Sequence, residues 1–149
     1  IAYCHARGGR LCLLLLDMDH FKQINDGHGH ETGDRALQLA ARHLVRCSGP
    51  NDLAARVGGE ELALLLASPV ATALQRAEAL RRNFESEPLV LPDGGTVRLQ
   101  TSIGLADLAP DRPQLDALMR AADRALYAAK ARGRNQVVCA TGTGASSPA

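Results

Sequence analysis

Aromatic residues are scarce in this chain, and tryptophan is absent. Two Tyr and two Phe give an aromatic content of 3% in 149 residues, whereas 46% of the residues are apolar. The core must therefore be built mainly from Leu, Ala, Val and Ile. A chain of this length is most simply one domain and is long enough to bury a core of its own.

Neither sign of charge dominates the sequence. Lys and Arg number 17 and Asp and Glu number 16, so the formal net charge is +1 at pH 7. The two signs are interspersed along the chain. General electrostatic attraction to nucleic acid or to an anionic membrane is not indicated, and we expect neither as a partner of this segment.

Paired cysteines and long hydrophobic runs are also missing. The apolar run at 11–16 is too short to span a bilayer, and residues 1–10 do not resemble a signal peptide. The cysteines lie far apart without a CxxC pair, at Cys4, Cys12, Cys47 and Cys139. They complete no familiar zinc-ligand spacing with His20, His28 and His30. We therefore expect reduced thiols and a cytoplasmic location, although the full-length protein could be anchored in a membrane.

A glycine pair at Gly58 and Gly59 separates two apolar segments. Their apolar residues are Leu53, Ala55 and Val57 before the pair and Leu62, Leu64 and Leu66 after it. Two glycines between such segments predict a β-hairpin with a tight turn. Glu60 and Glu61 follow at once, beside a backbone that no side chain shields. Adjacent carboxylates in this setting indicate a divalent cation, but an ordinary hairpin with solvated acids explains this stretch alone equally well.

The continuous apolar run at 11–16 predicts a strand that is covered on both faces. Asp17 then lies at its carboxyl end, where α/β sheets commonly place ligands. Asp17 and Asp19 have the spacing of an EF-hand loop, but Lys22 stands where that loop requires glycine and Phe21 where it requires an oxygen ligand. A two-acid site with Lys22 nearby fits a metal-bound phosphate better.

Three helices are predicted in the remaining sequence. Gly27, Gly29 and Gly33 should keep the segment after the first strand non-helical, so that a helix begins near Asp34 and ends before 48–51. Apolar residues at helical spacing predict two more helices, one from Pro69 and one over 113–132. The arginines predicted to be solvated on the helix after Pro69 are Arg76, Arg81 and Arg82.

The strands complete an α/β (α+β) order. A second hairpin is predicted over 89–99, a strand over 101–106 and a short strand at 137–138. This order predicts helices packed on a central mixed sheet, with Asp17, Glu60 and Glu61 converging. We assign one domain to 1–140 and a disordered tail to 141–149, which contains mainly Gly, Ser, Thr and Ala. Residues 1–3 resemble the end of a helix.

Four separated motifs then point to a known family. They are Asp17-Met18-Asp19-His20-Phe21-Lys22-x-x-Asn25-Asp26, Gly29-His30 with Gly33-Asp34, Arg56-x-Gly58-Gly59-Glu60-Glu61, and Asp123-x-Ala125-Leu126-Tyr127-x-Ala129-Lys130-x-x-Gly133-Arg134-Asn135. With them the chain resembles a GGDEF domain, the catalytic domain of bacterial diguanylate cyclases. The resemblance implies a central mixed sheet flanked by helices, similar to the palm of polymerases and adenylyl cyclases. It also implies that a homodimer of such domains condenses two GTP into cyclic di-GMP and releases pyrophosphate.

The resemblance gives roles to the acids. It implies that Asp17, Glu60 and Glu61 are the catalytic acids. With the main-chain carbonyl of Met18, the same residues would hold Mg²⁺, or Mn²⁺ in its place. Glu61 either ligates the metal or assists deprotonation of the attacking hydroxyl, and both roles stay open. Divalent ions suit this reaction because they neutralise charge that develops during phosphoryl transfer.

The resemblance also implies a GTP site. Lys22, Lys130 and Arg134 match the cations that hold the β- and γ-phosphates, and Gly58 and Gly59 leave room for the nucleotide. The full set of residues implied to bind GTP is Lys22, His20, Phe21, Asn25, Asp34, Gly58, Gly59, Lys130 and Arg134.

Two members of that set read the base. Asn25 and Asp34 match the guanine-reading pair, and an Asp34 carboxylate would accept hydrogen bonds from guanine N1–H and N2–H. Adenine lacks this pair of donors, so Asp34 should discriminate against ATP. Main-chain amides near His20 and Phe21 would add donors for the phosphates.

The chain departs from the family pattern in three places. Leu62 replaces the usual Phe and should pack inward. Gly49 replaces the Arg of an Arg-x-x-Asp product-inhibition site of which only Asp52 remains, so we expect no allosteric inhibition site. Cyclic di-GMP would then rebind only at the active site, in competition with GTP. The opening Asp-x-Leu-Thr-Gly-Leu motif is not in this chain, and an N-terminal sensor or dimerisation domain is expected in the full-length protein.

Two alternatives to an active cyclase remain. The first is a catalytically silent GGDEF domain that serves as a receptor for GTP or cyclic di-GMP. Such domains usually lose an acid of the signature, whereas Glu60 and Glu61 are both present here. The second, a cyclase that makes a mononucleotide ring, is disfavoured because the motifs match the dinucleotide family.

Overall fold

The computed structural model describes residues 10–108 and 114–140, and the predicted tail at 141–149 and helix end at 1–3 lie outside these ranges. In chain order the elements are β1 (Cys12–Met18), α2 (Phe21–His28), α3 (His30–Cys47), β2 (Leu53–Gly58), β3 (Glu61–Leu66), α4 (Val70–Ser86), β4 (Leu89–Val90), β5 (Thr96–Val97), β6 (Thr101–Asp107), α5 (Leu115–Ala131) and β7 (Val137–Ala140).

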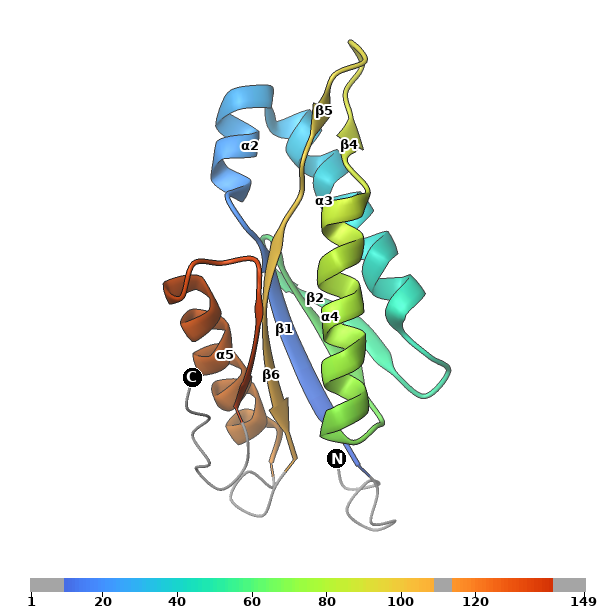
Figure 1. The fold of residues 1–149 in the computed structure, drawn as a ribbon, viewed down its shortest axis with the longest axis vertical. Helices are drawn as coiled ribbons and strands as arrows, with labels where there is room; N and C mark the ends of the chain where they lie inside the picture. The colour runs from blue at the N-terminus through green and yellow to red at the C-terminus, as the bar shows by residue number, and fades with distance from the viewer. Residues whose placement is uncertain (1–9, 109–113, 141–149) are drawn as a thin grey trace.

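A five-stranded sheet in the order β2-β3-β1-β6-β7 forms the centre of the fold (Figure 1). Strand β1 pairs antiparallel with β3 on one side and with β6 on the other, whereas β7 pairs parallel with β6. Strands β4 and β5 form a separate two-stranded hairpin. The predicted mixed sheet flanked by helices is confirmed. No helix of the described residues is long and apolar enough to cross a membrane.

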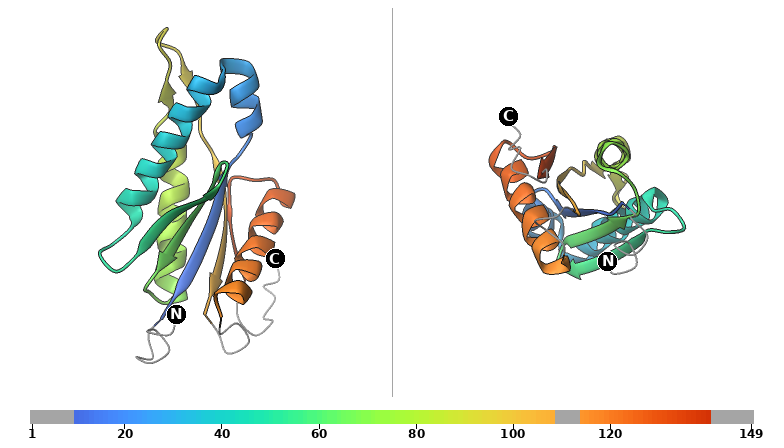
Figure 2. Two further views of the ribbon diagram at one scale, coloured as in Figure 1. Left: turned by 180° about the vertical axis from the view of Figure 1, so that it is seen from behind. Right: turned by 90° about the horizontal axis from the view of Figure 1, so that it is seen from below.

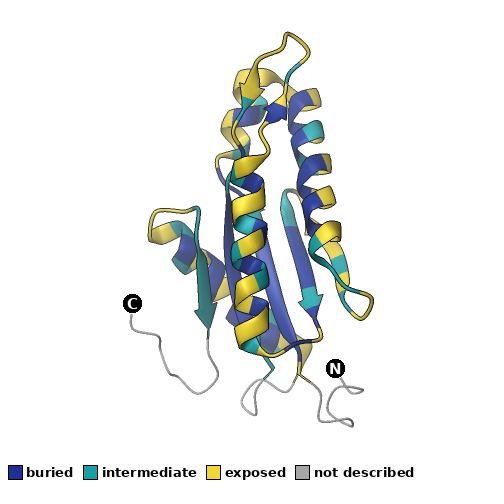
Figure 3. Cartoon of the chain, turned by 45° about the vertical axis from the view of Figure 1, so that its right-hand side comes forward, coloured by how far each residue is buried: buried dark blue, intermediate teal, exposed yellow. Residues whose placement is uncertain are grey.

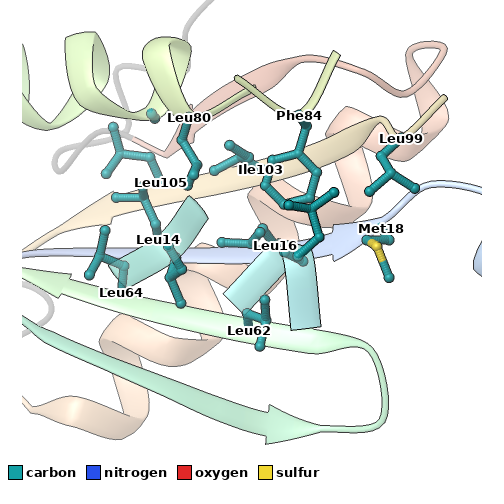
Figure 4. Packing of buried hydrophobic residues seen from close by; sticks show 14 of the residues in the cluster. Leu14, Leu16, Met18, Leu62, Leu64, Leu80, Phe84, Leu99, Ile103 and Leu105 are labelled. Atoms are coloured by element: carbon teal, nitrogen blue, oxygen red, sulfur yellow. The ribbon is translucent and has the colours of Figure 1, made fainter. Parts of the chain in front are cut away.

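Strand β1 is buried on both faces, as its continuous apolar sequence predicts. Leu14 and Leu16 pack into the core beneath α3 and α4, together with Phe84 (Figure 4). Leu13 and Leu15 point to the opposite face, which α5 covers. Figure 2 shows α5 and α4 on opposite sides of the sheet, and Figure 3 shows the buried central strands. Each fully buried Leu contributes about 1.5–3 kcal/mol, so β1 is strongly held in place.

The segment after β1 is helical, and the prediction of a non-helical stretch was wrong. Helices α2 and α3 are separated by Gly29 alone, whose φ of 91° suits glycine. Gly27 lies inside α2 and Gly33 inside α3. An interior glycine costs only about 1 kcal/mol relative to alanine. The buried face of α3, which includes Leu39 and Leu44, outweighs that cost.

Two of the three arginines predicted to be solvated on α4 are not. Arg76 donates from Nη2 to Asp52 Oδ2 at 2.8 Å and also to the carbonyl of Cys47. Asp52 accepts two further hydrogen bonds, from the amides of Gly49 and Ala67. Asp52 therefore joins three segments of chain. Arg81 is bound by neighbouring acids, whereas the Arg82 side chain is 68% exposed, as predicted.

The described cysteines form no disulfide. They are Cys12, Cys47 and Cys139, and Cys4 lies outside the described residues. Burial raises the pKa of the Cys12 thiol to about 12. A thiol with this pKa is inert at neutral pH, because the thiolate is the reactive form.

Gly104 is required for the contact between β6 and α5, which generates a prediction about stability. A Cβ at this position would lie 2.2 Å from the carbonyl oxygen of Ala122 and 2.3 Å from the amide of Leu126. Both atoms belong to the backbone of α5 and cannot turn aside. We expect Gly104→Ala to lower the free energy of unfolding by about 3 kcal/mol, measured by chemical denaturation.

The matched control is Gly27→Ala in α2. A Cβ there meets no atom within 4 Å, so the change should be neutral or stabilising by up to about 1 kcal/mol. Equal stability of Gly104→Ala and the unaltered protein would contradict the close packing of α5 on β6.

Candidate active site

Two acids lie opposite each other at one end of the sheet. Asp17, near the end of β1, is the register partner of Glu61, the first residue of β3. Glu60 occupies the turn between β2 and β3, directly after Gly59 with its φ of 42°. Arg56 braces this turn by donating from Nε to the Gly59 carbonyl at 2.9 Å. The antiparallel pairing thus gathers acids that are more than 40 residues apart in sequence.

Asp17 has one satisfied and one unsatisfied oxygen. Oδ2 forms an ion pair with Lys130 Nζ, and the Asp17 side chain is only 14% exposed. Oδ1 is buried and accepts no hydrogen bond from the described residues. A buried acceptor without a partner is costly, and a bound cation is one kind of partner that would satisfy it.

Glu61 lies in an acidic environment. Its pKa is raised by burial first, and then by the negative charges of Asp17 and Asp123, with Lys130 opposing. Asp123 belongs to α5 and was quoted in the last motif without a role. It lies seven residues before Lys130, and two helical turns place both residues on the same face. That spacing was the signal by which sequence reasoning could have placed Asp123 beside the other acids.

Next to the acids is a cleft of about 300 Å³ that cations border. Lys22, Lys130 and Arg134 line it together with Asp17 and Glu60. Within residues 10–108 and 114–140, Lys130 pairs with Asp17, but neither Lys22 nor Arg134 has a carboxylate partner. Two unpaired cations beside one cleft favour an anionic ligand.

The N-terminus of α2 faces the same cleft through His20 and Phe21. His20, the N-cap residue, has a left-handed φ of 59° and makes no side-chain capping hydrogen bond. The first amides of α2 are therefore not capped by that side chain. Free amides and the helix dipole make such an end suitable for phosphate. Met18 also lines the cleft, at the end of β1.

A second cavity, of about 540 Å³, lies between α3 and β2. Asp34 and Arg56 border it, and Leu37 and Leu62 supply apolar surface. Leu62 is 4% exposed and packs inward, as expected (Figure 4). In the hairpin turn after β2, a Cβ at Gly58 would meet no atom within 4 Å. The same holds at Gly59.

Asn25 does not line this cavity but lies against α3 beside Asp34. A Cβ on Gly33 would come within 1.8 Å of Asn25 Oδ1 and 3.3 Å of Phe21. Gly33 therefore leaves the room that the Asn25 amide occupies. This packing explains a glycine inside α3 that sequence reasoning had interpreted as a helix breaker.

No ready-made metal centre is present in the described part of the chain. No group of three or more His, Cys, Asp or Glu side chains there is arranged to hold an ion. The donors at the end of β1 are all oxygen atoms, which suits Mg²⁺ or Ca²⁺ better than zinc.

An α/β domain with acids at a strand end and a cation-lined cleft has the features of a domain that handles phosphate esters. Residues 1–136 match the family described as "Diguanylate cyclase, GGDEF domain". The chain belongs to this GGDEF family.

Curated relatives and solved structures agree with this assignment. The chain is 38% identical to diguanylate cyclase A of Treponema denticola over 128 residues, which are 85% of this chain and 34% of that protein. It is 43% identical to diguanylate cyclase DgcM of Escherichia coli K12 over 129 residues, which are 86% and 30% of the two chains. It thus spans about a third of the length of these relatives.

Two solved structures are similar over nearly the whole chain. The GGDEF domain of DgcB from Caulobacter crescentus, in complex with c-di-GMP, has a TM-score of 0.89 and 34% identity, covering 93% of this chain and 82% of that one. The active GGEEF domain of a diguanylate cyclase from Vibrio cholerae has a TM-score of 0.86 and 29% identity, covering 93% and 88%.

The raised pKa of Glu61 generates a prediction about stability without metal. The folded-state pKa lies above the ordinary value of 4.5, so ionising Glu61 destabilises the fold. This cost is absent below pH 4.5 and develops as the pH rises through the folded pKa. In metal-free buffer we expect Glu61→Gln to raise the melting temperature at pH 7 and to lose that gain near pH 4.

Glu31→Gln is the control for this measurement, because Glu31 is exposed in the first turn of α3. The helix dipole favours its charge, so no gain is expected. A melting temperature of Glu61→Gln that stays at or below that of the unaltered protein at pH 7 argues against the acidic cluster.

Proposed function

We propose that this domain is a diguanylate cyclase that condenses two GTP into cyclic di-GMP and releases pyrophosphate. The observation that carries the proposal is the pairing of Asp17 with Glu61 beside a cleft bordered by unpaired Lys22 and Arg134. The relatives named diguanylate cyclases and the active GGEEF domain of Vibrio cholerae support it.

Asp17, Glu60 and Glu61 would hold Mg²⁺, or Mn²⁺, with the Met18 carbonyl as a further ligand. The unsatisfied Oδ1 of Asp17 and the all-oxygen donor set fit such an ion. Mg²⁺ is usually held by one or two carboxylates together with substrate phosphates, which agrees with the lack of a preformed three-ligand group. When bound, the ion would lower the pKa of the attacking 3′-hydroxyl and stabilise charge on the α-phosphate.

The cations and the helix N-terminus would position the triphosphate. Lys22 and Arg134 are the charges available to the β- and γ-phosphates, and the first amides of α2 add donors. Lys130 neutralises Asp17 while no ligand is bound. An arriving cation would release Lys130 toward the phosphates.

The cavity beside α3 would hold guanine. Its apolar surface suits a base, and Asp34 at its edge supplies the acceptor for guanine N1–H and N2–H. Asn25, kept beside Asp34 by the bare surface of Gly33, would complete the recognition. Glu61 would either ligate metal or take the proton of the attacking hydroxyl, and its raised pKa makes it a stronger base than an ordinary glutamate.

Catalysis would require a homodimer, because each domain offers one such site and the product contains two nucleotides. The curated relatives are about three times as long as the matched segment, so a sensor or dimerisation domain would bring two copies together. Solved relatives include a DgcB fragment with a coiled coil and SiaD in complex with its activator SiaC.

Cyclic di-GMP would inhibit the domain only by binding at the active site. The residue at position 49 is glycine, and Asp52 is already bound by Arg76 and two main-chain amides. Position 49 therefore lacks the arginine that would clamp guanine and phosphate, and the carboxylate of Asp52 is in structural use with Arg76.

The alternative function is a receptor for GTP or cyclic di-GMP without turnover. One experiment separates it from the cyclase. Incubation with GTP and Mg²⁺ should release pyrophosphate at a rate that rises with the square of protein concentration, because two domains must meet. Glu60→Gln should lower the rate at least about a hundredfold, since it removes a carboxylate that would hold the metal ion.

Glu31→Gln, at an exposed position on α3, should keep the rate of the unaltered protein. Binding of GTP without pyrophosphate release, at protein concentrations that produce dimers, would favour the receptor and reject the cyclase.

A further inference from the structure

The loop between α5 and β7 has an unusual backbone. Gly133, Arg134 and Asn135 have successive φ values of 115°, 65° and 48°. Glycine adopts the left-handed region without cost and asparagine tolerates it, but an arginine there is unfavourable. A run of this kind persists only where the surrounding structure imposes it. The loop lies beside the end of β1 (Figure 1).

Asp19 provides the main-chain anchor of this loop. Its Oδ2 accepts a hydrogen bond from the amide of Asn135 at 2.9 Å, and its Oδ1 accepts one from Ser102 Oγ at 2.7 Å. Asp19 is 5% exposed. Both oxygens of Asp19 accept a hydrogen bond from the protein, whereas Asp17 Oδ1 accepts none from the described residues.

Helix α4 provides the side-chain anchor. Asn135 Nδ2 donates to Glu85 Oε2 at 2.7 Å, and Arg81 Nη1 donates to Asn135 Oδ1 at 3.2 Å. Arg81 also pairs with Glu85 at 3.0 Å, which closes a ring of three side chains. Both ends of the Asn135 amide are therefore held.

Arg134 is the residue that these anchors orient. Its guanidinium has no hydrogen-bond or ion-pair partner within 10–108 and 114–140, and it lines the cleft with Lys22. Of the anchors, Asp19 also lines the cleft, whereas Glu85 and Arg81 line neither the cleft nor the cavity beside α3. The backbone conformation of the loop, and not a contact of the arginine side chain, sets where Arg134 points.

We infer that Asn135, held by Asp19 and Glu85, is a positioning residue that fixes Arg134 toward the triphosphate of a bound nucleotide. The inference rests on the proposed function, because it takes the cleft as a triphosphate site. It predicts that loosening Asn135 weakens contacts to the outer phosphates and leaves contacts to base, ribose and α-phosphate unchanged.

The test compares two ligands by calorimetry. One is 3′-deoxy-GTP with Mg²⁺, which lacks the attacking hydroxyl and therefore binds without turnover, and the other is GMP. Asn135→Gly keeps the amide for Asp19 and accepts the left-handed φ, but removes the side-chain anchor. We expect it to weaken 3′-deoxy-GTP about tenfold and to change GMP affinity less than about twofold.

A swapped pair makes the test specific. Asn135→Asp places a carboxylate against Glu85 and should weaken 3′-deoxy-GTP. In the double variant Asn135→Asp with Glu85→Gln, the amide at position 85 donates to the carboxylate at position 135, which reverses the direction of the original hydrogen bond. This double variant should recover most of the affinity for 3′-deoxy-GTP. In a chain that already carries Arg134→Ala, adding Asn135→Gly should cause no further loss of affinity, because the asparagine acts through the arginine. Asn83→Ala, at an exposed asparagine of α4, is the matched control and should bind both ligands normally.

The possible outcomes separate the two claims. Equal losses for GMP and 3′-deoxy-GTP in the Asn135 variants would assign them a general structural role and overturn the inference. Additive losses in the double variant with Arg134→Ala would overturn it too. If the unaltered protein binds neither ligand, the proposed function itself fails and the inference falls with it.

Discussion

The register between β1 and β3 determines where Asp17 lies relative to the acids of the hairpin. Asp17 faces Glu61 only because Leu16 faces Leu62, and Leu14 faces Leu64, along the same pair of strands. A slip of one residue would turn each of these side chains to the opposite face of the sheet. The leucines of β1 are buried on both faces, so the hydrophobic core prevents such a slip. The packing of the core therefore also fixes the position of Asp17 opposite Glu61.

Charge balance explains the arrangement around that pair. Asp17, Glu60, Glu61 and Asp123 would repel one another without a cation nearby. Lys130 supplies one positive charge in the ligand-free domain. The pKa of Glu61 stays raised, first by burial and then by the charges of Asp17 and Asp123, although Lys130 opposes the shift. A divalent ion and a triphosphate would bring opposite charges in together, which lets the acids ionise and frees the lysine.

Sequence patterns within a single segment predicted the strands and turns that depend mainly on that segment. The continuous apolar run gave β1, and the glycine pair gave the hairpin with its acids. Helix α2 was missed because Gly27 and Gly33 were treated as breakers, although tertiary packing outweighs the small helix penalty of glycine. Gly33 is there for the Asn25 side chain, a contact between two helices that no periodicity reveals.

Side-chain partners across elements were the least predictable. Arg76 and Arg81 lie on what the helical pattern marks as a polar face, yet one holds Asp52 and the other holds Asn135. Asp19 and Asn135 were visible as motif residues, but their 2.9 Å contact joins positions 116 apart in sequence. Only the folded chain brings them together.

The central claim is that Asp17 and the hairpin acids gather a divalent ion together with the triphosphate. Binding of Mn²⁺, followed by electron paramagnetic resonance with and without 3′-deoxy-GTP, tests it most directly. The account predicts that protein and nucleotide together bind Mn²⁺ at least about tenfold more tightly than either alone, and that Asp17→Asn abolishes this gain. An unchanged gain in Asp17→Asn would contradict it.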